Sequence, residues 1–315
     1  MAHVVLAGGS GSVGSDVTDA ILAKKKHKVT VFTRRERTNV PSAGVNYVTV
    51  DYENKTQLVE ALRGVDVVLS FLADSNFDLV QRMQELLIDA CVEAGVKRFA
   101  PSEWGTRSNS ASPHYAFKDR VREYLEEVNR KETILEYCLF QPGFFTNFFA
   151  WPHKTTPHFT LIPMYVDFHN RRALVPGDGN FTITLTTIED MAAVVAEALD
   201  YPGKWPTVGG IQGSQITIKE LVELGNKLRG SMKVESVAQE VYEDGKLQTS
   251  WVPRIDHPAI PVELRERMSE EIVAGYFKAI EAGSWAVSDE WNKLLPHYRF
   301  SNAEEYLANV WRGKP

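Results

Sequence analysis

Short apolar runs alternate with amphipathic stretches along the first 150 residues of the chain. Runs rich in β-branched and aromatic residues predict strands at 3–6, 29–32, 45–50, 65–70, 98–100 and 136–140. Stretches with apolar residues at a helical period predict helices at 14–25, 56–63, 78–94 and 113–130. Because strands and helices take turns, this half favours an α/β fold with a doubly wound parallel sheet.

The rhythm changes after Pro142. Residues 143–180 are loop-like and aromatic, and the chain alternates again from Thr182. The pattern beyond predicts helices at 189–199, 218–229, 261–282 and 303–311, with a strand at 207–211. This second half lacks the strand-helix rhythm, so we expect a smaller, α-rich domain that caps the first.

Glycines cluster directly after the first predicted strand, from Gly8 to Gly14. They read as GxGxxG on Gly9, Gly11 and Gly14, or as GxxGxxG on Gly8, Gly11 and Gly14. Either spacing lets backbone N–H groups approach a pyrophosphate at a helix N-terminus. The place between strand and helix makes this a dinucleotide-binding motif of a Rossmann-type fold. The predicted contacts to the cofactor are Gly8, Ser10, Gly11, Ser12, Val13 and Gly14.

The end of the second strand predicts the choice of cofactor. Arg34 stands twenty residues beyond Gly14, where an NAD-binding protein carries an acidic residue. An arginine can instead bind the 2′-phosphate of NADPH or NADP⁺. Arg34 is the best-placed candidate, with Arg35 or Arg37 assisting, and the alternative is a set of surface arginines on a loop. We therefore expect residues 1–150, joined again by 181–212, to form an NADP-binding domain, and 151–180 with 213–315 to form the substrate domain.

The helix that begins at Pro113 holds the candidates for proton transfer. A Tyr-x-x-x-Lys pair would share one helix face, but Tyr115 precedes Lys118 by three residues and His114 takes the four-residue position. Lys118 can act alone if burial lowers its pKa, whereas its plain alternative is an exposed helix lysine. His114 is either a proton relay or a partly exposed residue of the first turn.

Composition narrows the class of protein. The 315 residues carry 35 basic and 41 acidic side chains, a net charge of −6, so we expect no nucleic-acid partner. Two cysteines and the lack of CxxC or HExxH predict neither a disulfide framework nor a metal site. No apolar run is long enough for a membrane span, and the N-terminus lacks a signal-peptide pattern. These features predict a cytoplasmic protein.

Several segments together resemble a known family. They are Gly8 to Gly14, Arg34, the Phe-Ala-Pro-Ser-Glu-Trp-Gly run at 99–105, Phe117-Lys118, Val121-Arg122, and residues 177–180 and 304–307. In this order they resemble the NmrA-like atypical short-chain dehydrogenases, and among these the isoflavone reductase-like group with the pinoresinol–lariciresinol and phenylcoumaran benzylic ether reductases. Trp104 replaces the phenylalanine usual in the plant enzymes and is more similar to the fungal branch.

The resemblance implies an NADPH-dependent oxidoreductase in which Lys118 serves as the acid or base. Aromatic residues at 144–168 suit a small aromatic or conjugated substrate, such as a phenolic, quinone-like or enone compound. Two alternatives stay open: an NADP-sensing regulator without turnover, a class that tends to lack the lysine, and a non-redox isomerase or dehydratase. The sequence does not decide the oligomeric state, and a homodimer stays open.

Residues at other strand ends complete the predicted site. Phe71 and Leu72 follow the fourth strand and are expected beside the cofactor. Pro142, Gly143 and Phe144 follow the sixth and are expected to flank the nicotinamide. For Glu103 we favour a structural role next to the lysine helix. Asn147 either contacts a ligand or caps its own loop.

Overall fold

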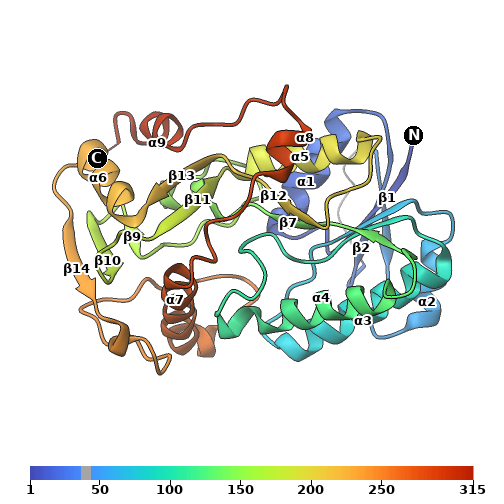
Figure 1. Cartoon of the computed structure of the whole chain (residues 1–315), viewed down its shortest axis with the longest axis horizontal. Coiled ribbons are helices and arrows are strands. Elements are labelled where there is room, and N and C mark those ends of the chain that lie inside the picture. Colours follow the sequence, from blue (N-terminus) through green and yellow to red (C-terminus); the bar gives the residue numbers. More distant parts are fainter. Residues whose placement is uncertain (37–43, 315) are drawn as a thin grey trace.

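The computed structural model describes residues 1–36 and 44–314. A six-stranded sheet forms its centre, with every neighbouring pair parallel and the order β3-β2-β1-β4-β5-β6 (Figure 1). The strands are β1 (His3–Ala7), β2 (Lys28–Thr33), β3 (Val45–Thr49), β4 (Val67–Ser70), β5 (Arg98–Ala100) and β6 (Glu136–Tyr137). This strand order is the one typical of dinucleotide-binding folds, so the predicted fold class is confirmed.

Helices cover both faces of this sheet because β1 sends alternate side chains to opposite sides. Val4 and Leu6 pack in one apolar cluster, whereas Val5 and Ala7 pack in another. The first cluster includes α1 (Ser12–Ala23) and α5 (Ile188–Asp200). The second includes α2 (Lys55–Leu62), α3 (Phe77–Ala94) and α4 (Ala116–Val128), on the lower side in Figure 1.

Local signals set the helix ends in the first half. Asn54 and Asn76 cap α2 and α3 by accepting backbone N–H groups, and Gly95 ends α3 in the left-handed conformation. The helix predicted at 113–130 starts differently, because a 3₁₀ turn (Pro113–Tyr115) precedes α4. The predicted helix that carries Lys118 is therefore confirmed from Ala116 to Val128.

The strand predicted at 136–140 is divided at Cys138. The Cys138 N–H donates to the carbonyl of Phe99 in β5, whereas the Leu139 N–H donates to the carbonyl of Thr207. The chain thus exchanges one neighbour for another, and β7 (Leu139–Gln141) pairs in parallel with β12 (Val208–Gly210). Through β12 and α5 the later part of the chain returns to the dinucleotide-binding half.

The second half contains more strand than the sequence pattern indicated. One three-stranded sheet consists of β8 (Phe144–Phe145), β11 (Thr182–Thr186) and β13 (Ser214–Thr217), and another of β9 (Val166–Asp167), β10 (Arg172–Pro176) and β14 (Lys233–Val237). The helices are α6 (Ile218–Arg229), α7 (Arg265–Glu281), α8 (Glu290–Leu294) and α9 (Ala303–Trp311), with 3₁₀ turns at Thr146–Ala150, Gln239–Val241 and Val262–Leu264. The alternation predicted from Thr182 corresponds to β11. The two-residue strands β8 and β9 and the largely exposed β14 carry too little apolar alternation to be recognised from sequence.

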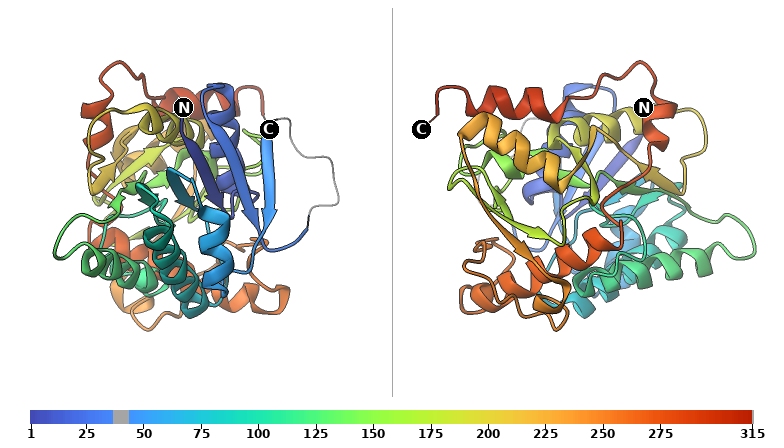
Figure 2. Two further views of the ribbon diagram at one scale, coloured as in Figure 1. Left: turned by 90° about the vertical axis from the view of Figure 1, so that its right-hand side faces the viewer. Right: turned by 60° about the vertical axis from the view of Figure 1, so that its left-hand side comes forward.

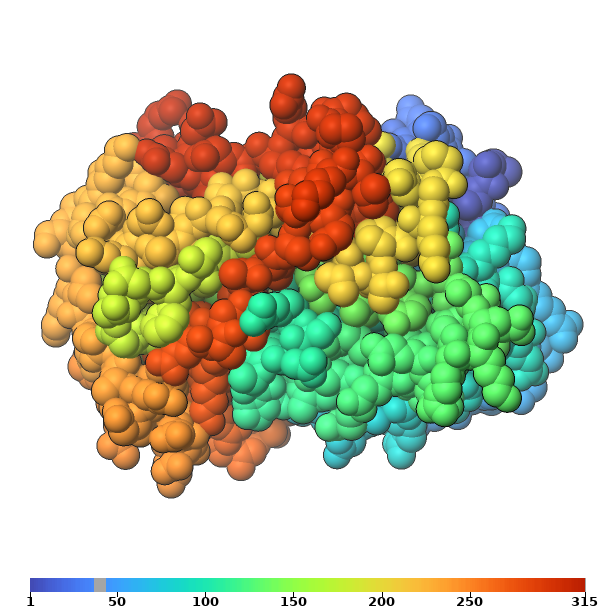
Figure 3. All heavy atoms as spheres, viewed as in Figure 1, coloured from blue at the N-terminus to red at the C-terminus, as the bar shows by residue number. Residues whose placement is uncertain are grey.

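The two halves lie along the long axis of the molecule, with the described chain ends far apart (Figures 1 and 2). Residues of α7 and α8 cover the boundary between them on the face shown in Figure 3. We propose that residues 1–150 with 181–212 form the cofactor half and that 151–180 with 213–315 form the substrate half. Among the described residues, no helix has the length and apolar character needed to cross a bilayer.

Candidate active site

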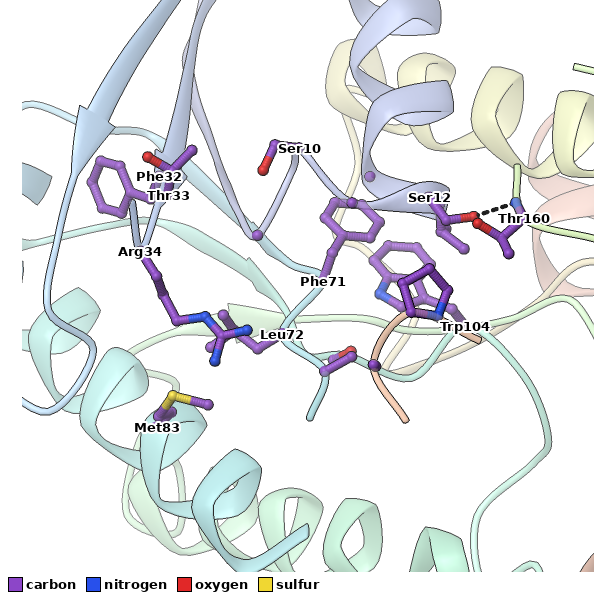
Figure 4. Close-up of a pocket in the computed structure, with 18 of the residues that line it drawn as sticks. Ser10, Ser12, Phe32, Thr33, Arg34, Phe71, Leu72, Met83, Trp104 and Thr160 are labelled. Carbon is purple, nitrogen blue, oxygen red and sulfur yellow. Dashed lines mark hydrogen bonds between the residues drawn. The ribbon is translucent and has the colours of Figure 1, made fainter. Parts of the chain in front are cut away.

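A cavity of about 560 Å³ lies where β1, β2 and β4 end, at the carboxyl edge of the sheet (Figure 4). Most of its wall comes from the cofactor half. The lining residues there are Gly8, Ser10, Gly11, Ser12, Val13, Gly14, Phe32, Thr33, Arg34, Tyr52, Phe71, Leu72, Ala73, Met83, Ser102 and Trp104. The second half adds Thr160, His257, Pro258 and Ala259. All six predicted contacts of the glycine segment are therefore gathered at one cavity.

The glycine turn presents free backbone donors to this cavity. The Gly11 N–H closes the turn on the Gly8 carbonyl, and α1 has no side-chain cap and no acidic residue in its first turn. The N–H groups of Ser12, Val13 and Gly14 donate to no protein acceptor in the part of the chain that the structure describes. Such a helix N-terminus favours an anion, so these groups fit a pyrophosphate.

Close approach explains the last glycine of the motif. A Cβ atom on Gly14 would lie 2.7 Å from the Gly9 Cα, and one on Gly9 would lie 2.5 Å from the Leu6 Cβ. Any side chain at these positions would push the helix away from the turn. Tyr52 supports the turn from the other side, because its hydroxyl accepts the Gly8 N–H at 3.0 Å and donates to the Phe32 carbonyl at 3.2 Å.

Arg34 stands at the end of the cavity away from Trp104 (Figure 4). Its side chain is 55% exposed and pairs with Asp74 at 3.1 Å. Arg35 shares an adjoining hollow with Arg34, Ser10 and Asp74, whereas Arg37 lies outside the described residues. The free positive edge of Arg34 fits a 2′-phosphate, although a carboxylate stands beside it.

Four nearly parallel rings run inward from the cavity: Phe71, Trp104, Phe140 and Trp291. Phe71 and Trp104 stack at 4.5 Å, Trp104 and Phe140 at 5.6 Å, and Phe140 and Trp291 at 5.5 Å between ring centres. Trp104 is the only tryptophan among the described residues that line this cavity. Its backbone is left-handed, with φ +46°, a conformation rare for a bulky residue. The indole N–H holds it there by donating to the Ser70 carbonyl at 2.8 Å.

Lys118 lies behind the strand end that forms this wall. Its Nζ donates to the Glu103 carbonyl, between cavity residues Ser102 and Trp104, and lies 4.2 Å from the centre of the Tyr115 ring. The side chain is half-buried, and desolvation lowers the pKa of Lys118 to about 8, an effect that Glu103 opposes. An amine with such a pKa exchanges protons near neutral pH.

A buried ion pair holds the other side of Glu103. Its carboxylate lies 3.4 Å from Nε of Arg122, and Arg122 also contacts Asp119. Burial raises the pKa of Glu103, while Arg122 and Lys118 act in the opposite direction. Glu103 therefore anchors the lysine helix to the strand end, as its structural interpretation predicts.

Other predicted residues lie apart from the cavity. His114 packs edge-on against Phe77, with ring centres 5.5 Å apart, and beside Gly275 of α7. Gly143 donates its N–H to the Gly105 carbonyl, and the ring of Phe144 stacks on Trp285. Neither these residues nor Pro142 belong to the cavity lining, so their catalytic and nicotinamide contacts stay predictions.

Asn147 has a structural role. Its side-chain nitrogen has Thr155, Glu189 and Tyr306 within hydrogen-bond distance as acceptors for its two hydrogens, and its oxygen accepts the Ile188 N–H at 2.8 Å. Both of its N–H hydrogens and one lone pair of its oxygen have partners within the protein. Asn147 therefore joins its loop to the start of α5 and to α9, which favours a structural role over contact with a ligand.

A family comparison decides the relationship that the motifs suggested. The model of the NmrA-like family matches residues 2–307. The chain belongs to the NmrA-like family. Among curated members, this NmrA-like protein is 28% identical to the oxidoreductase swnN of Metarhizium robertsii over 78% of this chain and 80% of that one. It is 26% identical to a phenylcoumaran benzylic ether reductase of Populus trichocarpa, over 96% and 97%.

Solved structures share the fold of this NmrA-like protein. AtPrR2 with NADP⁺ and (+)-pinoresinol superposes with a TM-score of 0.70 at 22% identity, covering 98% of both chains. Leucoanthocyanidin reductase of Vitis vinifera with NADPH reaches 0.72 at 19% identity, covering 98% of this chain and 99% of that one. The resemblance to isoflavone reductase-like proteins is thus confirmed at the level of family and fold.

Proposed function

We propose that the protein is an NADPH-dependent reductase of a small aromatic or conjugated metabolite, of the phenolic, quinone-like or enone class. One observation carries the proposal: a single strand end joins the two parts of the site. Ser102 and Trp104 line the cavity, and the carbonyl between them accepts a hydrogen bond from Lys118. Relatives named oxidoreductase and phenylcoumaran benzylic ether reductase support reductase chemistry.

The residues present fit the dinucleotide. The open N–H groups at the start of α1 suit its pyrophosphate, and Arg34 suits the 2′-phosphate. Two structural neighbours, AtPrR2 with NADP⁺ and leucoanthocyanidin reductase with NADPH, support this choice. When bound, NADPH supplies the hydride for the reduction.

The proton for the reduced product comes from Lys118 in this proposal. Below pH 8 its Nζ carries the proton, and the Glu103 carbonyl keeps the amine at the strand end. Transfer from Nζ to a substrate oxygen leaves a neutral amine, which solvent protonates again. Both faces of Trp104 are covered, by Phe71 and by Phe140, so an aromatic substrate or the nicotinamide would stack on Phe71, the outermost ring of the column, and meet Trp104 at its edge.

A panel of phenolic, quinone and enone compounds tests the proposal. NADPH oxidation is followed by its absorbance, and products are identified by mass spectrometry, with wild type and Lys118→Ala side by side. We expect turnover by wild type only. Tight NADPH binding without turnover of any compound would contradict a reductase and favour an NADP-sensing regulator. A product formed without NADPH oxidation would favour an isomerase or dehydratase.

A further inference from the structure

A segment of the second half, residues 254–261, enters the wall of the cofactor cavity. His257, Pro258 and Ala259 line the cavity, and the orange ribbon of this segment passes beside Trp104, away from Arg34 (Figure 4). The segment is held on both sides, because Ile255 and Ile260 are buried in the core of the second half. His257 thus lies in the cavity wall on a segment that is anchored at both ends.

The hydrogen bond at Nδ1 determines which proton the imidazole of His257 carries. The Ala259 N–H donates to Nδ1 at 3.1 Å, so Nδ1 must present its lone pair. Desolvation and the charge of Arg265 both lower the pKa of His257, which keeps the ring neutral at neutral pH. In a neutral ring with an accepting Nδ1, the proton is on Nε2.

Nε2–H of His257 is an unused donor. The ring is half-buried, and within residues 1–36 and 44–314 no protein acceptor receives this proton. Phe71 and Trp104 contribute aromatic surface to the same cavity. A complementary ligand has a ring that packs on this wall and an uncharged or anionic oxygen that accepts the hydrogen bond.

We infer that His257 is a substrate-binding residue whose Nε2–H donates a hydrogen bond to a carbonyl or phenolic oxygen of the substrate. This inference deepens the proposed reductase function and rests on it. The phosphates of the dinucleotide are assigned to the start of α1 and to Arg34, at other parts of the cavity. The carboxamide oxygen of the nicotinamide is the competing acceptor, and the experiment separates the two.

The test compares His257→Leu, which removes the donor, with His257→Gln, whose side-chain amide restores an N–H group. His297→Leu is the matched control, because His297 is 66% exposed and lies beside Glu197, outside the cavity. NADP⁺ affinity is measured by calorimetry. The value of kcat/KM is measured with the best substrate of the panel. For His257→Leu we expect NADP⁺ binding within about twofold of wild type and a roughly 10–100-fold lower kcat/KM, the usual cost of losing a buried hydrogen bond. His257→Gln is expected to recover part of this loss.

A substrate analogue with the oxygen replaced by a methyl group completes the test. We expect wild type and His257→Leu to bind this analogue equally. A tenfold loss of NADP⁺ affinity in His257→Leu would instead assign His257 to the cofactor and overturn the inference. An unchanged kcat/KM in His257→Leu would also overturn the inference. An equally large loss of affinity for the analogue would do the same, because it would indicate a purely structural role of His257.

Failure of the proposed function has a different signature: no compound of the panel oxidises NADPH. The inference is then decided by binding alone. 4-Hydroxycinnamaldehyde is added to the NADP⁺-loaded protein, and the Nε2 nitrogen of His257 is observed by NMR. A shift of this resonance in wild type, with binding weakened in His257→Leu, supports the inference. No shift overturns it.

Discussion

Lys118 combines a half-buried position with a single strong acceptor, the Glu103 carbonyl. Because its pKa is lowered to about 8, the protonated form of a reductive general acid is present below that pH and lost above it. We expect log kcat to be level at lower pH and to fall through about pH 8. The Lys118→Ala variant should lose roughly 10²–10⁴ in kcat together with this inflection. A pH profile of both proteins is the measurement.

Lys118→Arg is the matched control for charge. It keeps a cation at the same position, but an arginine does not release its proton at accessible pH. We therefore expect no recovery of activity. His114→Ala tests the relay: a loss as large as that of Lys118→Ala would show that His114 takes part, whereas wild-type kinetics would leave Lys118 acting alone.

Arg34 and Asp74 form an exposed pair, and pairs of this kind contribute little to stability. The carboxylate nevertheless competes with a 2′-phosphate for the guanidinium. Asp74→Asn is expected to tighten NADPH binding several-fold, whereas Arg34→Ala should weaken it about 10–100-fold. NADH affinity should change little in both variants. Calorimetry with both cofactors measures this, and equal losses for NADPH and NADH in Arg34→Ala would show that Arg34 supports the fold instead.

At the scale of elements, the position of α1 depends on Gly14. A methyl group there would meet the Gly9 Cα at 2.7 Å, so Gly14→Ala must displace the helix N-terminus from the turn. We expect a loss of stability of about 1–3 kcal/mol, typical of overpacking. NADPH affinity should fall at least about tenfold, since the N–H donors move. Thermal unfolding and calorimetry measure both effects.

Ser15→Ala, one residue further along α1, is the control because it adds no atom and removes only the 3.4 Å hydrogen bond from the Ser15 hydroxyl to the Gly9 carbonyl. It should leave NADPH affinity nearly unchanged. A Gly14→Ala protein with normal cofactor affinity would contradict this prediction. It would mean that the glycine turn accommodates the methyl group without displacing the N–H donors.

Elements with a strong local period could be predicted from sequence. The buried strand before Gly8, the helices capped at Asn54 and Asn76, and the helix at 218–229 need only neighbouring residues to be recognised. The glycine segment and Arg34 were also readable, since their spacing follows from one strand-helix-strand unit.

Contacts between distant segments could not be predicted. Tyr52, Met83, Thr160 and His257 line the cavity, but no motif marks them and they come from different parts of the chain. Tyr52 could have been suspected as a strand-end tyrosine, whereas Thr160 and His257 depend on how the second half folds. The same holds for the break at Cys138, where one strand changes partners.

At the scale of the whole molecule, residues 156–160 of the second half dock on α1. Thr160 donates its N–H to Ser12 at 2.7 Å, and Thr156 donates to Asp16 at 3.3 Å. Desolvation is the main cause that raises the pKa of Asp16 from 3.8 to about 6. The folded protein therefore binds this proton more tightly than the unfolded chain, and stability decreases as the pH rises through this interval.

Asp16→Asn removes the buried charge and keeps an oxygen for Thr156. We expect its melting temperature to exceed that of wild type by a few degrees at pH 7–8, and the difference to vanish below about pH 3, where the carboxyl group of Asp16 is neutral in both the folded and the unfolded protein. Asp19→Asn is the control on the same helix, because Asp19 is 57% exposed and pairs with His158. A lower melting temperature for Asp16→Asn at pH 7–8 would show that the charge stabilises the docked segment.

The four stacked rings behind the cavity also make the protein its own optical sensor. Trp104 is at the cavity wall and Trp291 is at the inner end of the same column. Tryptophan emits at wavelengths that a reduced nicotinamide absorbs. A cofactor bound beside Trp104 would therefore quench the tryptophan fluorescence by energy transfer and emit light itself. Trp104→Phe keeps a ring in the column and removes the contribution of Trp104, while the other tryptophans, Trp291 among them, still transfer energy. The difference between the two proteins then isolates the part of the signal that comes from Trp104, in real time and without any added label.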